Sequence, residues 1–316
     1  MINPHISKCL LLIALLVIAL MATPALAQST ITIGAWNIQY LGSPQCRPSN
    51  NPAQQAEEIA DFVIASGVDV LGLSEITDDD NASATQTNRT LTHAMQIIQQ
   101  KTGQEWRYGL FRKFQNGTGC KARHIQLVGL AWNTTRARSV GSVRIPINSA
   151  SAPNNITVWN RHPYAVKFQF GQNQTDVVLI VVHMKSNVGT NTALVREWEA
   201  RLLVQQLNFV RNHFKDNDII ILGDTNVLGA HETAITRLVG AGFSDLNGQD
   251  RSTTIRNEAF DRIFVRLGQP EFTGSRQEVF GRDYLNYTTE QFLQRLSDHY
   301  LVKTSISIST DDDDPQ

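Results

Sequence analysis

Apolar runs and helical repeats alternate along most of this chain. Short runs rich in Val, Ile, Leu and Phe are typical of buried strands. Such runs predict strands at residues 31–36, 69–74, 125–132, 140–145, 164–170, 177–183, 218–222, 260–265 and 300–306. Helical spacing predicts helices over 52–66, where Gly67 would close the last turn, and over 91–100. Strands separated by helices in this way predict an α/β fold in which helices cover the sheets.

A longer helix is expected from Thr192, because threonine often caps a helix N-terminus. Its apolar side would consist of Leu194, Trp198, Leu202, Leu207, Val210 and Phe214. The chain shows no low-complexity linker and no repeat of fixed period. We therefore expect one domain over residues 28–310, followed by an acidic, solvated tail at 311–316.

The first residues have the pattern of an export signal. Lys8 precedes the uncharged apolar run from Cys9 to Leu20, and the small-x-small sequence ending at Ala27 follows. This pattern predicts a secretory signal peptide over residues 1–27. The alternative is a transmembrane anchor, but the run is shorter than the ~20 residues that span a bilayer. We expect a secreted or periplasmic monomer with no membrane anchor after cleavage.

Export changes the interpretation of the cysteines. Cleavage after Ala27 would leave only Cys46 and Cys120 in the mature chain. Two cysteines in an oxidising compartment favour one disulfide. Two unpaired thiols are the alternative.

Composition narrows the class of protein. Of the 316 residues, 41% are hydrophobic, and 28 basic residues balance 29 acidic ones. A disordered chain would have fewer apolar residues and a less balanced charge. Three cysteines are too few for a small disulfide-stapled scaffold. The balanced charge argues against a broadly basic surface that binds nucleic acid passively.

Polar residues at strand ends carry the candidate chemistry. The expected strands run directly into Asn37, Glu75, His183 and Asp224, and Asp298-His299 opens the final strand. Any one of these residues alone is typical of a turn or a cap, but together they indicate a site. Carboxylate and amide oxygens suit a hard cation such as Mg²⁺, and histidines suit proton transfer near neutral pH. No zinc spacing, P-loop, Rossmann fingerprint or G-x-S-x-G nucleophile occurs.

Six short motifs resemble the endonuclease/exonuclease/phosphatase superfamily in both content and order. They are WN (36–37), SE (74–75), VVH (181–183), GDTN (223–226), FDRIFV (260–265) and SDH (297–299). The resemblance extends from about Ile31 to Val302. It is closest to the deoxyribonuclease I-like branch, which FDRIFV and RHPYAVKF (161–168) favour.

The resemblance implies a four-layer α/β/β/α sandwich with two packed mixed β-sheets and a metal-dependent phosphoesterase activity. It places Glu75 as the direct metal ligand, with Asn37, Asp224 and Asp298 in the same cluster. Together with Asn226, Asp224 would orient the phosphate, the nucleophile or a metal.

The remaining roles implied by the resemblance concern proton transfer and substrate binding. His299 would be the base that activates water, and Asp261 would hold its tautomer. His183 would be the acid partner across the scissile phosphate. Arg161 would contact a substrate phosphate.

The chain also departs from the family pattern. An acidic run at 77–80 follows Glu75, where pancreatic-type enzymes have a basic residue that reaches into the minor groove. The stretch from 111 to 126 contains no carboxylate to pair with His183. Basic residues around Cys120, Arg123 among them, could contact a substrate backbone. The alternative is a solvated charged loop.

These observations predict a secreted phosphodiesterase that hydrolyses DNA, with RNA as a possible further substrate, by attack of His-activated water. The expected cofactor is Mg²⁺, with Mn²⁺ or Ca²⁺ as alternatives. A sphingomyelinase-like or inositol-phosphate phosphoesterase is a second hypothesis. A lipid enzyme should expose an apolar hairpin, whereas the loops here are mostly polar. A non-catalytic binding protein is a third, but it predicts lost site residues, and all six motifs are intact.

Overall fold

The computed structural model describes residues 30–48, 51–80, 85–113, 117–149, 152–153, 156–172, 174–281 and 283–310. The expected signal peptide (1–27) and the acidic tail (311–316) lie outside the described residues. Among the residues that are described, we find no helix with the length and apolar character needed to cross a membrane.

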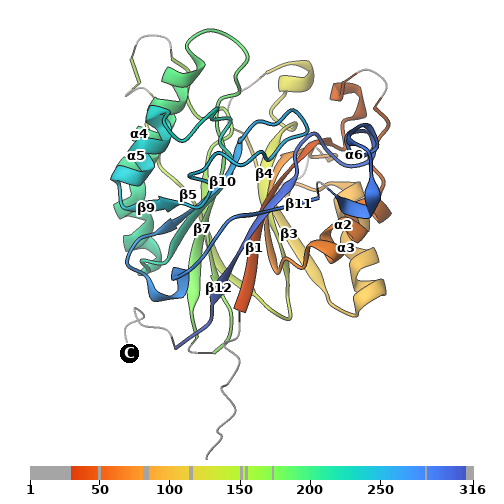
Figure 1. The fold of residues 1–316 in the computed structure, drawn as a ribbon, viewed down its shortest axis with the longest axis horizontal. Coiled ribbons are helices and arrows are strands. Elements are labelled where there is room, and N and C mark those ends of the chain that lie inside the picture. Colours follow the sequence, from red (N-terminus) through yellow and green to blue (C-terminus); the bar gives the residue numbers. More distant parts are fainter. Residues whose placement is uncertain are drawn as a thin grey trace, which may run out of the picture.

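Two six-stranded sheets pack face to face (Figure 1). The first has the order β11-β12-β1-β2-β4-β3. Its strands are β1 (Thr30–Leu41), β2 (Val70–Ile76), β3 (Trp106–Phe111), β4 (Leu127–Asn133), β11 (Glu278–Phe280) and β12 (Leu301–Ser307). The second has the order β5-β6-β7-β8-β10-β9. Its strands are β5 (Arg138–Arg144), β6 (Tyr164–Gln169), β7 (Asp176–His183), β8 (Ile219–Asp224), β9 (Phe243–Asp245) and β10 (Asp261–Arg266).

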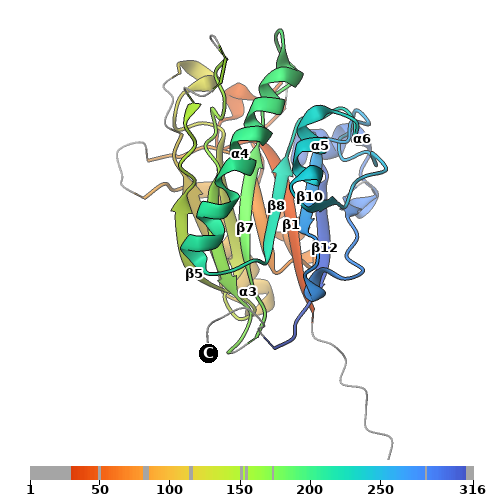
Figure 2. The ribbon, with the colours of Figure 1, turned by 90° about the vertical axis from the view of Figure 1, so that its left-hand side faces the viewer.

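Helices cover the outer face of each sheet (Figures 1 and 2). The first sheet is covered by α2 (Ala56–Ser66), α3 (Arg89–Thr102) and α6 (Thr289–Arg295). The second is covered by α4 (Thr192–Phe214) and α5 (Thr233–Gly240). Short 3₁₀ turns lie in the connections: η1 (Pro44–Cys46), η2 (Gly119–Lys121), η4 (Pro270–Phe272) and η5 (Tyr284–Asn286). One apolar core fills the space between the sheets and another lies under each helical layer. The predicted four-layer sandwich is confirmed.

Local sequence explains where these elements form. Strand β7 is buried at every position, as its unbroken apolar run requires between a second sheet and a helix. Strand β5 alternates between half-buried and exposed residues, which suits a strand at the edge of its sheet. Helix α2 ends at Ser66 and is followed by Gly67, whose φ of 67° confirms the expected glycine cap.

Some expected boundaries were wrong. Helix α2 begins at Ala56 rather than at residue 52. Thr192 is the first residue of α4 rather than its cap. The N-cap is Asn191, which makes no side-chain capping bond. Strand β3 was missed because residues 106–111 mix exposed, half-buried and buried side chains and lack an apolar run.

The predicted apolar side of α4 was also partly wrong. Leu194 is 41% exposed, whereas Arg196 and Glu199 are buried. The Arg196 guanidinium pairs with Glu232 at 2.8 Å, and the Glu199 carboxylate accepts two backbone N–H bonds. The other five predicted residues lie in the core or pack against it, so the predicted face was wrong at Leu194 and incomplete in omitting these two polar residues.

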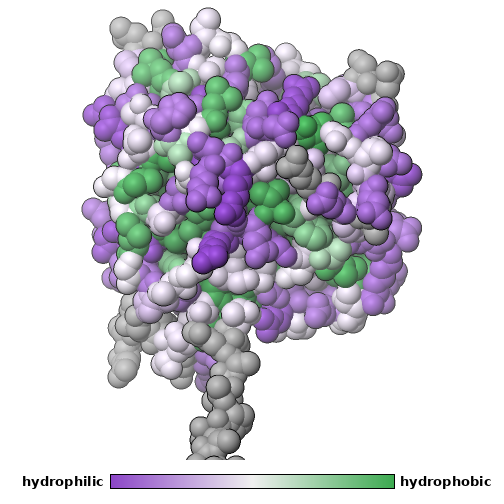
Figure 3. Space-filling view, viewed as in Figure 1, coloured by the Kyte–Doolittle hydropathy of each residue, from purple (hydrophilic) through white to green (hydrophobic). Residues whose placement is uncertain are grey.

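Both central strand pairs, β1/β2 and β7/β8, are parallel. Their carboxyl ends therefore meet at one end of the sandwich, the upper end in Figure 1. Strands β10 and β12 run antiparallel to these neighbours and begin at that same end. On the face shown in Figure 3, hydrophobic residues are scattered among hydrophilic ones.

Candidate active site

The strand ends meet at a cleft with a volume of about 690 Å³. Glu75 in β2, His183 at the end of β7 and Asp224 at the end of β8 line it. Asp298 and His299, just before β12, also line it. Residues that lie far apart in the sequence are thus brought together by the strand order.

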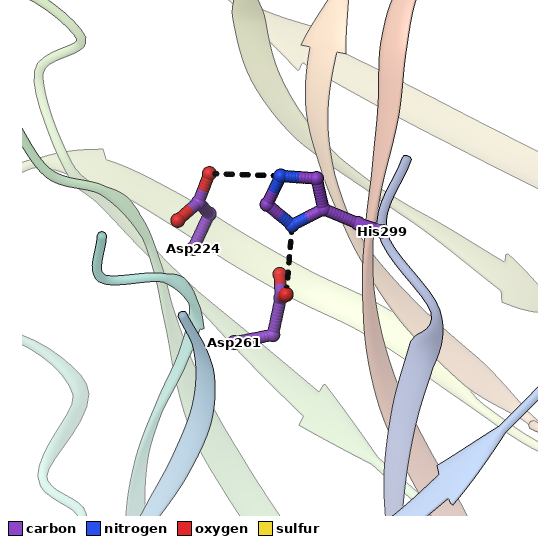
Figure 4. A group of neighbouring side chains, drawn as sticks. All are labelled: Asp224, Asp261 and His299. Carbon is purple, nitrogen blue, oxygen red and sulfur yellow. Dashed lines mark hydrogen bonds and ion pairs between the residues drawn. The ribbon is translucent and has the colours of Figure 1, made fainter. Parts of the chain in front are cut away.

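His299 forms a buried pair with Asp261. Its Nδ1 lies 2.8 Å from Asp261 Oδ2, which also accepts a bond from Thr253 Oγ1 at 2.9 Å (Figure 4). Burial alone would lower the pKa of His299, but the Asp261 and Asp224 carboxylates outweigh burial and hold this pKa well above its usual value. The pair is oriented so that Nε2 faces the cleft, 3.9 Å from Asp224 Oδ2.

Asp224 is the centre of the hydrogen-bond network. Asn37 Nδ2 donates to Asp224 Oδ2 at 2.9 Å, and the backbone N–H of Asn226 donates to Oδ1 at 2.9 Å. Asn226 has a left-handed backbone, with φ of 53°, and its side-chain amide donates to Met184 O at 3.3 Å. Burial raises the pKa of Asp224 to about 6, with the Asp261 carboxylate adding to the shift.

The pKa of His183 shifts in the direction opposite to that of His299. Its Nε2 lies 3.5 Å from Asp224 Oδ2 and 3.8 Å from Glu75 Oε1. Burial, followed by the charges of Arg161 and His299, lowers its pKa well below the usual value. Its buried Nδ1 has no hydrogen-bond partner among the described residues. This agrees with the expectation that residues 111–126 supply no carboxylate for it.

Glu75 is held by strained backbone that sequence reasoning missed. Tyr40, Glu75 and Gln126 all have left-handed φ values, of 56°, 62° and 60°. The register shifts between Asn37 and Leu41 where β1 pairs with β2, and shifts again where β2 pairs with β4. Such strain persists only where the surroundings enforce it, and it clusters at functional sites.

These irregular positions bring hydrogen-bond donors to the carboxylate of Glu75, and Gln126 Nε2 lies 3.5 Å from its Oε1. The backbone N–H of Tyr40 donates to Glu75 Oε2 at 3.2 Å, and Gln126 Nε2 donates to the Tyr40 hydroxyl at 3.0 Å. Burial raises the pKa of Glu75 to about 7, and the Asp298 and Asp224 charges contribute to this rise. Tyr40 and Gln126 are therefore positioning residues for Glu75.

The donor set fits a hard divalent cation. Asp224, Asp261 and His299 offer ligand atoms within 4.8 Å of one another. Asp261 and His299 are hydrogen-bonded to each other, so a cation beside Asp224 would draw further oxygen ligands from Glu75 and Asp298. These two carboxylates line the same cleft but, among the described residues, do not form an equally close group with Asp224. A cation would relieve the repulsion that raises the pKa of Glu75.

Asn37 contacts Asp224, in the cluster where it was expected. It is buried, with 1% of its surface exposed, and it is not among the residues lining the cleft. Its Nδ2 is bonded to Asp224, and its Oδ1 accepts the Gln39 N–H at 3.1 Å. Asn37 therefore lies behind Asp224 and orients it, rather than facing a cation directly.

Arg161 lines the cleft beside His183. Its Nε donates to His183 O at 3.1 Å, and its Nη2 donates to Met184 O at 2.5 Å. These bonds fix the plane of the guanidinium. Arg123, the other predicted substrate contact, is exposed and is not among the residues lining the cleft, whereas Lys121 is.

Residues outside the cleft hold two of the segments that line it. Cys46 in η1 and Cys120 in η2 form the predicted disulfide, with an S–S distance of 2.07 Å. Glu199 in α4 accepts the backbone N–H groups of Trp159 and Lys185, each at 2.8 Å. Sequence reasoning missed Glu199 because an acidic residue within a helix is ordinarily solvated.

Comparisons with known proteins agree with this geometry. A sequence model of the Endonuclease/Exonuclease/phosphatase family matches residues 34–299. The human Nocturnin catalytic domain is 15% identical, with a TM-score of 0.56 over 92% of this chain and 100% of that chain. D. rerio TDP2 is 16% identical, with a TM-score of 0.54 over 89% of this chain and 100% of that chain. An endonuclease/exonuclease/phosphatase from Beutenbergia cavernae is 13% identical, with a TM-score of 0.58 over 89% of this chain and 72% of that chain.

A search of curated protein sequences gives no match. At these identities the solved structures establish the fold alone. The family match, in contrast, covers most of the chain and contains all six motifs. The protein therefore belongs to the endonuclease/exonuclease/phosphatase family.

Proposed function

We propose that this protein is a secreted, Mg²⁺-dependent phosphodiesterase that hydrolyses DNA, and also RNA, with little sequence preference. The observation that carries the proposal is the oriented His299–Asp261 pair facing a cleft with three carboxylates and Arg161. A base, a set of cation ligands and an anion-binding arginine are what hydrolysis of a phosphodiester requires.

His299 is the proposed general base. Its Nε2 takes a proton from water as the water oxygen attacks phosphorus, and Asp261 stabilises the imidazolium that forms. The ester P–O bond on the far side breaks, and the leaving oxygen takes up a proton from solvent water. His183, which its environment keeps neutral, donates a hydrogen bond from Nε2 on the leaving-group side.

The other residues hold the substrate and the charge. Glu75, Asp224 and Asp298 would hold a divalent cation, which when bound would neutralise phosphate oxygens. Arg161 contacts a phosphate from the opposite side, with its guanidinium held by two backbone carbonyls. Two solved structures with this fold are described with anions: human Nocturnin with bound sulfate, and D. rerio TDP2 with single-strand DNA product.

Export rests on two observations. The first residues have the pattern of a signal peptide, and the Cys46–Cys120 bond suits an oxidising compartment. Secretion by a host carrying the full gene, with a mature N-terminus near residue 28, tests this part of the proposal. A full-length chain retained inside the cell would contradict it.

A substrate panel tests the activity. The mature protein is incubated with plasmid DNA, RNA, sphingomyelin and an inositol phosphate, with Mg²⁺ or with EDTA. We expect nicking of plasmid and cleavage of RNA, both abolished by EDTA. Turnover of the lipid or the inositol phosphate without nicking would contradict a nuclease, and no turnover of any substrate would contradict an enzyme.

A further inference from the structure

The cleft has a basic side, formed by Lys113, Lys121, Arg161 and Lys185. Within the described part of the chain, none of the four lies within 4.0 Å of a carboxylate oxygen. The strand orders place this basic side between the β3 and β4 strands of one sheet and the β6 and β7 strands of the other. Glu75 and His183 lie between it and the His299–Asp261 pair. The three lysines of the basic side therefore lie next to the proposed catalytic centre, and Arg161, which donates to the His183 carbonyl oxygen, joins the two.

Burial makes two of these four cations more than a solvated surface patch, whereas Lys185 is half-buried and Lys121 is exposed. Lys113 is 6% exposed and Arg161 is 9% exposed. Among the described residues, Lys113 Nζ has one partner, the Lys121 carbonyl oxygen, at 3.4 Å. Burial and the nearby Arg161 charge lower the pKa of Lys113 to about 8. Buried cations without a counter-ion are costly, and a bound anion offsets this cost.

The surrounding structure fixes this side of the cleft. The Cys46–Cys120 bond holds the turn that carries Lys121, and Glu199 holds the backbone N–H of Lys185. Phe111, two residues before Lys113, stacks on Tyr164 with ring centroids 4.2 Å apart, which joins the ends of β3 and β6. An anion would thus meet cations that are already in place.

We infer that Lys113, Lys121 and Lys185, together with Arg161, form a subsite for a second phosphate group of the substrate. This inference rests on the proposed function, which puts the scissile phosphate between His299 and His183. It narrows the substrate class to molecules with two neighbouring phosphates, such as a polynucleotide or an oligonucleotide with a terminal phosphate. The quaternary ammonium of a phosphocholine lipid would instead be repelled by this side.

Three thymidine dinucleotides test the subsite: dTpdT, its 5′-phosphorylated form and its 3′-phosphorylated form. With Mg²⁺ saturating, we expect one phosphorylated form to have a kcat/KM about ten- to a hundredfold above that of dTpdT, because charge-assisted hydrogen bonds are gained. This ratio should fall towards one in Lys121→Ala. It should also fall towards one in Lys113→Met, because methionine keeps the buried, unbranched apolar part of the lysine side chain and removes its charge. In Arg107→Ala, which removes an exposed cation at the opposite end of β3, the ratio should stay unchanged.

Binding in EDTA separates this inference from the proposed function. There we expect a phosphorylated dinucleotide to bind more tightly than dTpdT, and the lysine variants to lose this difference. Such binding without any hydrolysis in Mg²⁺ would overturn the nuclease and keep the subsite. Equal binding of all three dinucleotides, or a difference that survives in both lysine variants, would overturn the subsite.

Discussion

The two histidines of the cleft have opposite pKa shifts because their charged neighbours differ. Burial lowers the pKa of both histidines, but the Asp261 and Asp224 carboxylates outweigh it at His299, whereas the charges of Arg161 and His299 add to it at His183. Groups whose environments separate their pKa values in this way commonly divide the work of proton transfer. The proposed division into a base and a neutral donor follows from this arrangement.

Asp261→Asn should move the pH dependence of activity. The raised pKa of His299 means that its neutral, basic form accumulates only as pH increases, so kcat/KM should rise with pH in the wild type. Without the Asp261 charge, the pKa of His299 falls, so the acid limb should shift to lower pH. The maximal rate should also fall by about 10–100-fold as the imidazole loses its orientation. A pH profile of plasmid nicking measures both effects.

Asp61→Asn, on the exposed surface of α2, is the matched control and should leave the profile unchanged. An acid limb at the same pH in Asp261→Asn and the wild type would show that this carboxylate does not set the pKa of the base.

At the scale of single residues, several of the residues that line the candidate site could be predicted from the sequence. Glu75, His183 and Asp224 were recognisable because each follows an apolar run, and a rigid strand end is a place where ligands gather. Tyr40 and Gln126 were not recognisable, because their positions depend on irregular pairing among β1, β2 and β4. Such pairing joins segments that are distant in sequence, and no local pattern encodes it.

At the scale of elements, a second acidic cluster lies at the other end of β7 and β8. Asp176 and Asp216 share Lys167, at 2.8 and 3.3 Å, and Asp218 accepts a bond from Gln269. Burial, and then the neighbouring Glu271, raises the pKa of Asp218 to about 9. The folded protein therefore holds a proton there that the unfolded chain releases above about pH 4. This group makes stability fall as pH rises from about 4 to about 9.

Asp218→Asn should therefore stabilise the protein at neutral and alkaline pH. The amide keeps an acceptor for Gln269 and supplies a permanent donor where the carboxyl must retain a proton. We expect the free energy of unfolding at pH 8 to increase by about 1–2 kcal/mol, with little change at pH 4. Urea unfolding at both pH values measures this difference. A variant that is less stable at pH 8 would show that Asp218 is ionised in the folded state.

The disulfide joins Cys46 and Cys120, which are 74 residues apart in the sequence. The double variant Cys46→Ser/Cys120→Ser frees a long loop in the unfolded state, so unfolding should become easier by about 2–4 kcal/mol. Because η2 carries Lys121, KM for a polynucleotide should also rise. Thermal unfolding and steady-state kinetics test the two effects separately. An unchanged melting temperature would contradict the structural role.

Sequence patterns were less reliable where polar networks override hydrophobicity. The expected α4 face included Leu194, which is exposed, and omitted Glu199, which is buried and holds two backbone donors. Strand β7 was predictable throughout, since it is buried on both faces and therefore apolar along its length. The position of an element that is stabilised by burial alone can be predicted from the sequence. The position of one that depends on polar partners distant in the sequence cannot.

At the scale of the whole molecule, the sandwich explains why the site exists. Two parallel strand pairs, one in each sheet, bring four carboxyl ends to the same end of the protein, and β10 and β12 begin there (Figure 1). The acidic centre lies over β1, β2, β8 and β12, and the basic side lies over β3, β4, β6 and β7. A near-neutral net charge is therefore compatible with a locally strong field for binding an anionic substrate.

Nicking of supercoiled plasmid by the wild type and by His299→Ala, measured across Mg²⁺ concentrations, tests the central claim most directly. We expect the wild type to nick with Mg²⁺ and to be inactive in EDTA. His299→Ala should be folded and slower by at least about 10²-fold at every Mg²⁺ concentration. Wild-type nicking that persists in EDTA, or nicking by His299→Ala at nearly the wild-type rate, would contradict a cation-dependent phosphodiesterase with His299 as its base.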